Sequence, residues 1–260
     1  MTSCKFRGGL GNQMFQIAAT CALALRNNDL YIFNFDKWEE WKDYAQGFNS
    51  SRYKNTIYKK LPYTDEYNEN NLYMESSYTY DPIPYSPNIT ISGRFQSEKY
   101  FKDYSDDIKN LFDLSYNLDI INCILNDIPR PITSIHVRRG DYFENKQCLN
   151  ELDIEYYTHA MTLTKNESFL IFSDDINWCK QHFDQKNIFF FEENDELINL
   201  IAMSLCDHNI IANSTFSWWG AYLNKNKHKT IIAPKIWVSP RLSNFSVLSK
   251  DVVPDDWIKI

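Results

Sequence analysis

The 260-residue sequence lacks several features that would place it in common protein classes. No two of its six cysteines form a C-x-x-C pair, and they are spread along the chain, which argues against a disulfide framework and against a zinc site. No apolar run approaches the length of a membrane span, and the first residues, MTSCKFRGGLGNQ, have no apolar core of signal-peptide length. These absences predict a cytoplasmic protein with reduced thiols and no transmembrane segment.

Positive charge is also in short supply. The chain has 27 Lys and Arg residues against 34 Asp and Glu residues, so its formal net charge is -7. A general affinity for nucleic acid is therefore disfavoured, because the nucleic acid backbone repels a protein of net negative charge. Basic groups that bind an anion must be gathered at one place in this chain.

Short apolar strands alternate strictly with helices in the second half of the sequence. This alternation predicts an α/β fold, in which a parallel sheet is covered by helices on both faces. The expected strands are residues 133–137, 168–173, 187–191, 208–212 and 230–234, and the expected helices are 153–163, 176–183, 195–206 and 214–223. Because ligands of such sheets bind beyond the carboxyl ends of the strands, the residues that follow each strand are candidates for a site.

The first half of the sequence gives a less regular pattern. A strand at 3–7, a glycine turn and a helix at 11–28 are followed by strands at 30–35 and 88–95 and an amphipathic helix at 97–112. Residues 37–87 are rich in Tyr and Asn, and they follow neither period, so they are left unassigned. Pro129 and Pro131 mark a boundary, which divides the chain into domains at 1–128 and 129–260.

Two adjacent arginines follow the expected strand at 133–137, in the stretch SIHVRRGDY. Arg138 and Arg139 carry planar forks of donors that match phosphate oxygens, and Gly140 allows the backbone to turn sharply. His136 lies two residues before Arg138 and therefore shares its face of the strand, which makes it a ligand candidate. The alternative for the arginines is an ordinary surface ion pair.

Carboxylates near these arginines have more than one use. Asp141 follows Gly140 directly, where it pairs with an arginine, caps a helix or accepts a proton as a base. Asp174 and Asp175 follow the next strand, in FSDDINW. They accept bonds from a ribose or from guanine N–H groups, or they cap the following helix, whose dipole favours acidic residues at its start.

Hydroxyl side chains open the helix that follows the strand at 208–212. Ser214 and Thr215 stand at its first turn, where free backbone N–H groups and the positive helix end favour an anion. The alternative is that Ser214 is an ordinary N-cap. Together with the arginines and aspartates, these residues gather polar groups on one edge of the predicted sheet.

A glycine-rich turn, GGLGN at residues 8–12, joins the first strand to the first helix. It lacks the G-x-G-x-x-G spacing of a dinucleotide turn. Its glycines, Gly11 among them, still allow a ligand to approach the backbone, and Asn12 and Gln13 offer amide hydrogen bonds. The alternative is a tight turn in which Asn12 caps the helix.

These motifs resemble the inverting α-1,2-fucosyltransferases of the bacterial and viral type, glycosyltransferase family 11. The matching segments occur in the family's order and cover most of the chain: GGLGNQMFQIA, FQSEKYF, SIHVRRGDY, EYY, FSDDINW and CDHNIIANSTFSWWGAYL. The resemblance implies a GT-B fold, meaning two Rossmann-like domains facing across a cleft. It also implies GDP-fucose as the donor and a galactose-terminated glycan as the acceptor, with no cofactor and no required metal. The chain likewise contains no D-x-D, the usual pattern for holding a metal–diphosphate in many glycosyltransferases.

The resemblance assigns roles to matching residues. Arg138 is expected to hold the β-phosphate and stabilise the leaving group, His136 to contact the nucleotide, and Asp174 to face the nucleoside. The predicted catalytic residues are thus Arg138, Asn12 and Asp141, the last a candidate base by proximity alone. The predicted donor-binding residues are His136, Arg139, Asp174, Ser214, Thr215, Phe216 and Gly11, of which Ser214, Thr215 and Phe216 are expected to cradle the diphosphate.

Three departures from the family pattern affect the N-terminal, acceptor-facing half. Ile17 stands where the family usually has Tyr, Arg94 stands where it often has an aromatic residue, and the chain is short for the family. They bear on the acceptor more than on the donor. Two alternatives therefore stay open, an enzyme of the same fold with another acceptor, such as a protein hydroxyl, and a catalytically silent sugar-nucleotide-binding protein.

Overall fold

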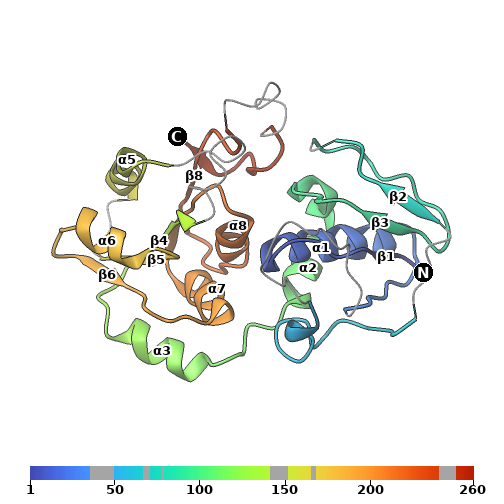
Figure 1. The fold of residues 1–260 in the computed structure, drawn as a ribbon, viewed down its shortest axis with the longest axis horizontal. Coiled ribbons are helices and arrows are strands. Elements are labelled where there is room, and N and C mark those ends of the chain that lie inside the picture. Colours follow the sequence, from blue (N-terminus) through green and yellow to red (C-terminus); the bar gives the residue numbers. More distant parts are fainter. Residues whose placement is uncertain (36–49, 67–70, 78, 141–151, 165–167, 240–249) are drawn as a thin grey trace. The chain divides into compact units, whose positions relative to one another are not determined.

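A computed structural model describes residues 1–35, 50–66, 71–77, 79–140, 152–164, 168–239 and 250–260. The chain forms two compact units, Met1–Ser115 and Tyr116–Ile260 (Figure 1). The sequence placed a domain boundary after residue 128. Helix α3 (Leu118–Asn126), which the sequence analysis did not assign, packs against α7 (Glu196–Leu205) within the second unit.

The second unit is built on one parallel sheet of six strands in the order β6-β5-β4-β7-β8-β9. The strands are β4 (Ile132–Val137), β5 (Ser168–Ser173), β6 (Ile188–Phe190), β7 (His208–Ile210), β8 (Ile231–Ala233) and β9 (Ile258–Lys259). The first five confirm the strands predicted from the sequence, and β9 is an addition at the sheet edge. Strand β4 lies between β5 and β7, so the residues that follow it stand at the middle of the sheet's carboxyl edge.

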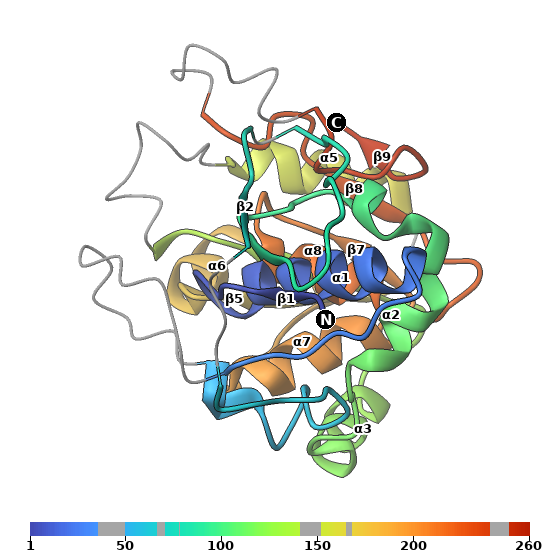
Figure 2. The same cartoon turned by 90° about the vertical axis from the view of Figure 1, so that its right-hand side faces the viewer.

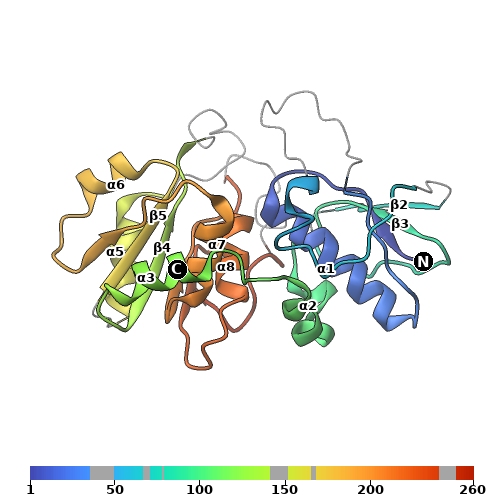
Figure 3. The same ribbon diagram turned by 90° about the horizontal axis from the view of Figure 1, so that it is seen from below.

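Helices cover both faces of this sheet. Ile135 and Val137 of β4 pack in one buried cluster with Tyr157 of α5 (Ile154–Thr164) and Cys179 of α6 (Ile176–His182). Helices α7 and α8 (Thr215–Tyr222) pack against each other on the opposite side (Figures 1 and 3). Since strand side chains alternate, His136 faces the side of α7 and α8.

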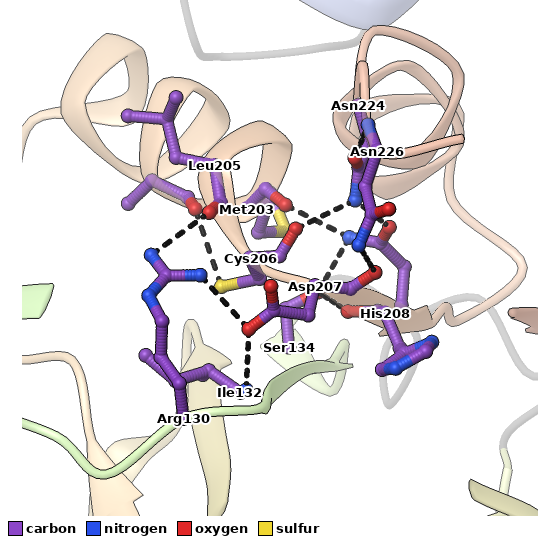
Figure 4. A network of polar contacts seen from close by, with 12 residues as sticks. Arg130, Ile132, Ser134, Met203, Leu205, Cys206, Asp207, His208, Asn224 and Asn226 are labelled. Atoms are coloured by element: carbon purple, nitrogen blue, oxygen red, sulfur yellow. Dashed lines mark hydrogen bonds and ion pairs between the residues drawn. The ribbon is translucent and has the colours of Figure 1, made fainter. Parts of the chain in front are cut away.

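A buried amide network joins β4 and β7 to the two helices on that side (Figure 4). The Asn209 amide donates to Ser134 Oγ at 2.7 Å and to the Met203 carbonyl at 2.8 Å. Its Oδ1 accepts from Asn224 Nδ2 at 2.8 Å, and Asn224 also donates to the Cys206 carbonyl. Because each polar atom is paired, the network costs little to bury and fixes the strands relative to α7 and α8.

A second polar contact holds the amino end of β4. Asp207, directly before β7, accepts from the Ile132 backbone N–H at 2.7 Å and pairs with Arg130 Nη1 at 2.8 Å (Figure 4). The amino end of β4 is thus tied to β7 by a carboxylate, and it is the end without candidate site residues.

The first unit contains a smaller parallel sheet in the order β1-β3-β2. Its strands are β1 (Ser3–Cys4), β2 (Leu72–Met74) and β3 (Thr90–Ser92). After β1 the chain turns at Gly8, whose φ of 74° favours glycine, and enters α1 (Leu10–Arg26). Helix α1 is apolar and buried along most of its length, and it packs against β1 (Figure 2).

Two sequence predictions in this unit are wrong. The expected strand at 30–35 forms only isolated bridges, Thr2 with Tyr31 and Phe33 with Tyr63. Its aromatic side chains pack instead: the Phe33 and Phe35 rings stack with centroids 6.0 Å apart. Burial of these rings outweighs the strand propensity of the same residues.

The expected helix at 97–112 is also divided. It forms two 3-10 turns, η2 (Glu98–Tyr100) and η3 (Lys102–Tyr104), followed by α2 (Ser105–Leu111). Phe101 between the turns is fully buried with φ -136°, outside the helical region, so its packing breaks the helix. A further 3-10 turn, η1 (Ser50–Tyr53), precedes β2. Among the described residues, no helix has both the length and the apolar character needed to cross a membrane.

Candidate functional site

The turn that follows β4 is held by Asp174, which directly follows β5. The backbone N–H groups of Arg139 and Gly140 donate to its two carboxylate oxygens at 2.9 and 3.1 Å. Arg138 Nη1 lies 2.8 Å from Asp174 Oδ2. A Cβ atom at Gly140 would approach the same oxygen to 2.9 Å, so glycine fits this position. The two strand-end motifs are therefore joined, and the carboxylate of Asp174 holds the guanidinium of Arg138 at the sheet edge.

The two adjacent arginines have different surroundings. The Arg139 side chain is 11% exposed; its Nε lies 3.4 Å from Asp175 Oδ2, and its Cζ lies 3.9 Å from the centre of the Trp178 ring. Asp175 also caps α6 by accepting from the Trp178 backbone N–H at 3.1 Å. The Arg138 side chain is 34% exposed. Arg138 is thus the arginine accessible to a ligand, whereas Arg139 ties the turn to α6.

His136 lies two residues before Arg138, on the same face of β4, and is almost fully buried. Burial first, and the positive charge of Arg138 second, lower its pKa to about 4, so the imidazole is neutral near pH 7. Among the described residues its Nδ1 has no hydrogen-bond partner. A buried polar atom of this kind is uncommon, and it suits contact with a bound ligand.

The first turn of α8 lies beside His136. The ring centroids of His136 and Phe216 are 5.7 Å apart, which brings the helix start to the end of β4. Ser214 is the N-cap residue with extended backbone, yet within the described part of the chain its hydroxyl makes no capping hydrogen bond. Ser214, Thr215 and Phe216 are all partly exposed. A helix start of this kind presents N–H groups and partial positive charge to an anion.

His136 should make the protein less stable in acid. Its pKa is lowered to about 4 in the folded chain, against an ordinary value of about 6.5 in the unfolded chain. The unfolded chain therefore binds a proton that the folded chain refuses, so the stabilising contribution of neutral His136 is complete above pH 6.5 and is lost as the pH falls to about 4. The loss amounts to about 3 kcal/mol in the free energy of unfolding.

Urea denaturation at several pH values between 7.5 and 4.5 measures this effect. The wild-type protein should lose more of its free energy of unfolding over that range than His136→Gln, because glutamine does not titrate. Parallel losses in the two proteins would contradict the assignment of a depressed pKa to His136.

In the first unit the glycine turn carries Asn12 and Gly11 in the first turn of α1. Asn12 does not cap this helix, because Gly9 is the N-cap residue. The Asn12 side chain is partly exposed, and its Oδ1 accepts from Gln96 Nε2 at 2.7 Å. Gly11 is buried and has no side chain to offer, so its predicted donor contact stays a prediction.

Gln16 is a site-supporting residue that the sequence analysis missed. Its fully buried amide accepts from the Arg7 backbone N–H and donates to the Arg7 carbonyl, both at 3.1 Å. It also donates to the Gly93 carbonyl at 3.1 Å, so it joins the segment that follows β1 to the segment that follows β3. Two glutamines, Gln13 and Gln16, on the apolar face of a helix were the available signal, because buried amides require partners.

The predicted site residues fall into three groups. Arg138 and Arg139 both contact Asp174, and His136 lies near Phe216 at the start of α8, where Ser214 and Thr215 also stand, all within the second unit. Asn12 and Gly11 belong to the first unit. Asp141, the candidate base, lies outside the described residues and stays a prediction.

Comparison with known proteins gives a family match over the whole chain. The model of the family described as "Glycosyl transferase family 11" matches residues 1–260. An α-1,2-colitosyltransferase of Escherichia coli is 28% identical, over 98% of this chain and 97% of that protein. A galactoside 2-α-L-fucosyltransferase of Caenorhabditis elegans is 25% identical, over 100% of this chain and 79% of that protein.

A solved structure supports the fold. The crystal structure of NodZ α-1,6-fucosyltransferase, soaked with GDP-fucose, aligns with 85% of this chain and 92% of its own, at 12% identity and a TM-score of 0.50. At this identity the likeness concerns the fold alone. The fold is α/β of the GT-B type, as the sequence motifs implied.

Proposed function

The chain belongs to glycosyl transferase family 11, and we propose from this membership that it moves L-fucose from GDP-fucose to the 2-hydroxyl group of a terminal galactoside. The protein is a glycosyltransferase, and the donor and acceptor are the proposed part. The named activity of the Caenorhabditis relative supports the galactoside acceptor, and the donor soaked into the related fold supports GDP-fucose.

One observation carries the proposal: a guanidinium stands accessible at the carboxyl end of a central parallel strand. Arg138 is held there by Asp174 at 2.8 Å, and the start of α8 lies nearby, beside His136. Ligands of open parallel sheets bind at this edge. A guanidinium fork and a helix start together form a site for the diphosphate of a sugar nucleotide.

The proposed reaction is a single in-line displacement. The acceptor hydroxyl attacks the anomeric carbon of fucose opposite to GDP while the bond from this carbon to the β-phosphate oxygen breaks, so the configuration inverts. The hydroxyl proton passes to a base, for which Asp141 stays the candidate. Negative charge builds on the departing β-phosphate, and fixed donors aimed at that charge lower the barrier most. The guanidinium of Arg138 supplies such donors, and the N–H groups at the start of α8 supply others.

His136 and Asp174 assist in different ways. His136 is neutral because its pKa is about 4, so it adds no charge and offers its Nδ1 to the nucleotide. Asp174 fixes Arg138 through the ion pair and through the turn, and its predicted contact with the nucleoside is an additional role. Arg139 acts through the turn, because its guanidinium is already packed on Trp178.

A donor and acceptor panel tests the proposal. GDP-fucose and GDP-colitose, with colitose being fucose that lacks the 3-hydroxyl group, are each offered with lactose, with free galactose and with buffer alone. GDP release is measured, and the product linkage is read by NMR. Transfer of fucose to the galactose 2-hydroxyl supports the proposal, whereas GDP binding without any transfer would favour the silent binding protein.

The colitose arm has a specific reason. The Escherichia relative that covers nearly the whole chain is named for colitosyl transfer. A clear preference for GDP-colitose would replace the donor in the proposal while leaving the site unchanged. A peptide with serine and threonine hydroxyls, added to the panel, tests the protein acceptor that the sequence left open.

Metal removal gives a further expected result. With Arg138 and the start of α8 facing the diphosphate, the proposed site neutralises the leaving group without a cation. EDTA at about 5 mM removes divalent cations from the protein. We expect the transfer rate under this condition to match the untreated rate within about twofold. A loss that Mg²⁺ or Mn²⁺ restores would contradict metal independence.

A further inference from the structure

A strained turn lies at the carboxyl end of β3. Phe95 has a φ of 50°, in the left-handed region that bulky residues rarely occupy. Glu75 holds this turn: its carboxylate accepts from the backbone N–H groups of Arg94 at 2.6 Å and Phe95 at 3.0 Å. Glycine is required at Gly93, because a Cβ atom there would lie 2.4 Å from the Glu75 Cβ. Strain that is held so firmly often marks a site where one residue must be placed accurately.

The residue that this turn places is Gln96. Its Nε2 donates to Asn12 Oδ1 at 2.7 Å, across 84 residues of sequence. The Phe95 ring is fully buried and meets the Tyr100 ring edge-on, with centroids 5.3 Å apart. The turn is therefore held by the Glu75 carboxylate at its backbone and by ring packing at its Phe95 side chain. Gln96 therefore reaches Asn12 from a rigid support.

The hydrogen bond fixes which end of the Asn12 amide is engaged by Gln96 and which end is left for a ligand. A primary amide accepts at its oxygen and donates at its nitrogen, and a half-turn about the last bond exchanges the two ends. Since Gln96 donates to Oδ1, the Nδ2 end is turned toward Gly8, where a Cβ atom would lie only 2.5 Å away. Because Gln96 occupies Oδ1 and the Asn12 side chain is partly exposed, the NH₂ group is the end of the amide left for a ligand, and it is a donor that suits the oxygen atoms of a sugar.

From this geometry we infer that Gln96 is a positioning residue for sugar transfer, which holds Asn12 with its NH₂ group toward the substrate. Gln96 acts through Asn12 and through no contact of its own with the substrate. The inference rests on the proposed function, because it requires Asn12 to contact a sugar during the reaction.

Two replacements at one position separate orientation from simple support. Gln96→Met keeps the length of the side chain and removes the donor, so the Asn12 amide is free to turn. Gln96→Glu keeps the shape and offers only acceptors near neutral pH, so the amide reverses and presents its oxygen. We expect kcat to fall about tenfold in Gln96→Met, which corresponds to one lost hydrogen bond, and about tenfold further in Gln96→Glu.

The same replacements are made at Gln181, an exposed residue of α6 in the second unit. Gln181→Met and Gln181→Glu should leave kcat unchanged. The KM for the donor and the melting temperature are measured for all variants, so that a loss of folded protein is recognised.

A double-mutant cycle gives the decisive readout. If Gln96 acts through Asn12, its replacement should lower kcat in the wild-type background and have no further effect in Asn12→Ala. Equal effects of Gln96→Met in both backgrounds would overturn the inference, as would equal rates for Gln96→Met and Gln96→Glu. These results leave the proposed function intact, whereas a wild-type protein that transfers no sugar overturns the proposed function and the inference together.

Discussion

Replacing Arg138 with alanine should lower kcat about 100- to 1,000-fold, because one well-placed donor to the developing charge contributes about 3–4 kcal/mol. The guanidinium is the accessible cation at the end of β4, and Asp174 holds it 2.8 Å away. Arg138→Lys should also lose most of the activity, since an ammonium group cannot reproduce the planar fork. Steady-state kinetics of GDP release with saturating donor and acceptor measure both variants.

Arg130→Ala is the matched control for Arg138→Ala. Arg130 lies before the amino end of the same strand and pairs with Asp207 at the same distance of 2.8 Å, so the variant removes the same charge and a similar ion pair. Its kcat should stay within about twofold of the wild-type value, since exposed ion pairs contribute little to stability. Near-wild-type turnover in Arg138→Ala, or an equal loss in Arg130→Ala, would reject the assigned role.

Replacing Asp174 with alanine should lower kcat/KM for the donor about 10- to 100-fold. The change leaves the N–H group of Arg139 without its acceptor, at a cost of about 1–3 kcal/mol for this part-buried donor, whereas the exposed N–H group of Gly140 can turn to water. It also releases Arg138, so the guanidinium samples positions away from the diphosphate. Asp174→Asn keeps one acceptor oxygen and should fall between the wild-type protein and Asp174→Ala.

The control for Asp174 is Asp195→Ala. Asp195 is the N-cap residue of α7 and accepts from the backbone N–H groups of Leu197 and Ile198. Loss of this cap should cost about 1 kcal/mol of stability without a change in kcat. If Asp174→Ala shifts the melting temperature as Asp195→Ala does and keeps full activity, Asp174 is a structural residue only.

The sheet of the second unit and its site edge could be predicted from the sequence because the signals are local. Strand β5 is an unbroken apolar run, and it ends as expected at Ser173, next to Asp174. Parallel strands must place their ends at one edge, so the meeting of Arg138 with Asp174 follows from the alternation of strands and helices. In the first unit the pattern failed where aromatic packing decided the backbone, as at Phe101.

The different roles of adjacent residues of the same type could not be predicted from the sequence. The sequence of two adjacent arginines does not indicate that Arg139 stacks on Trp178 while Arg138 stays accessible. The two adjacent aspartates likewise do not indicate that Asp175 caps a helix while Asp174 holds a turn. Such choices depend on side-chain directions across neighbouring strands, which a linear pattern does not contain.

The Gln16 side chain supplies the two hydrogen bonds that a neighbouring strand would give to the backbone of Arg7. Its amide pairs with both the N–H and the carbonyl group of Arg7, as a backbone peptide does in a ladder. The Arg7 amide proton should therefore exchange slowly with deuterated solvent, although Arg7 lies outside every strand. Asparagine is shorter by one methylene group and glutamate has no donor, so neither can form both of these bonds with Arg7.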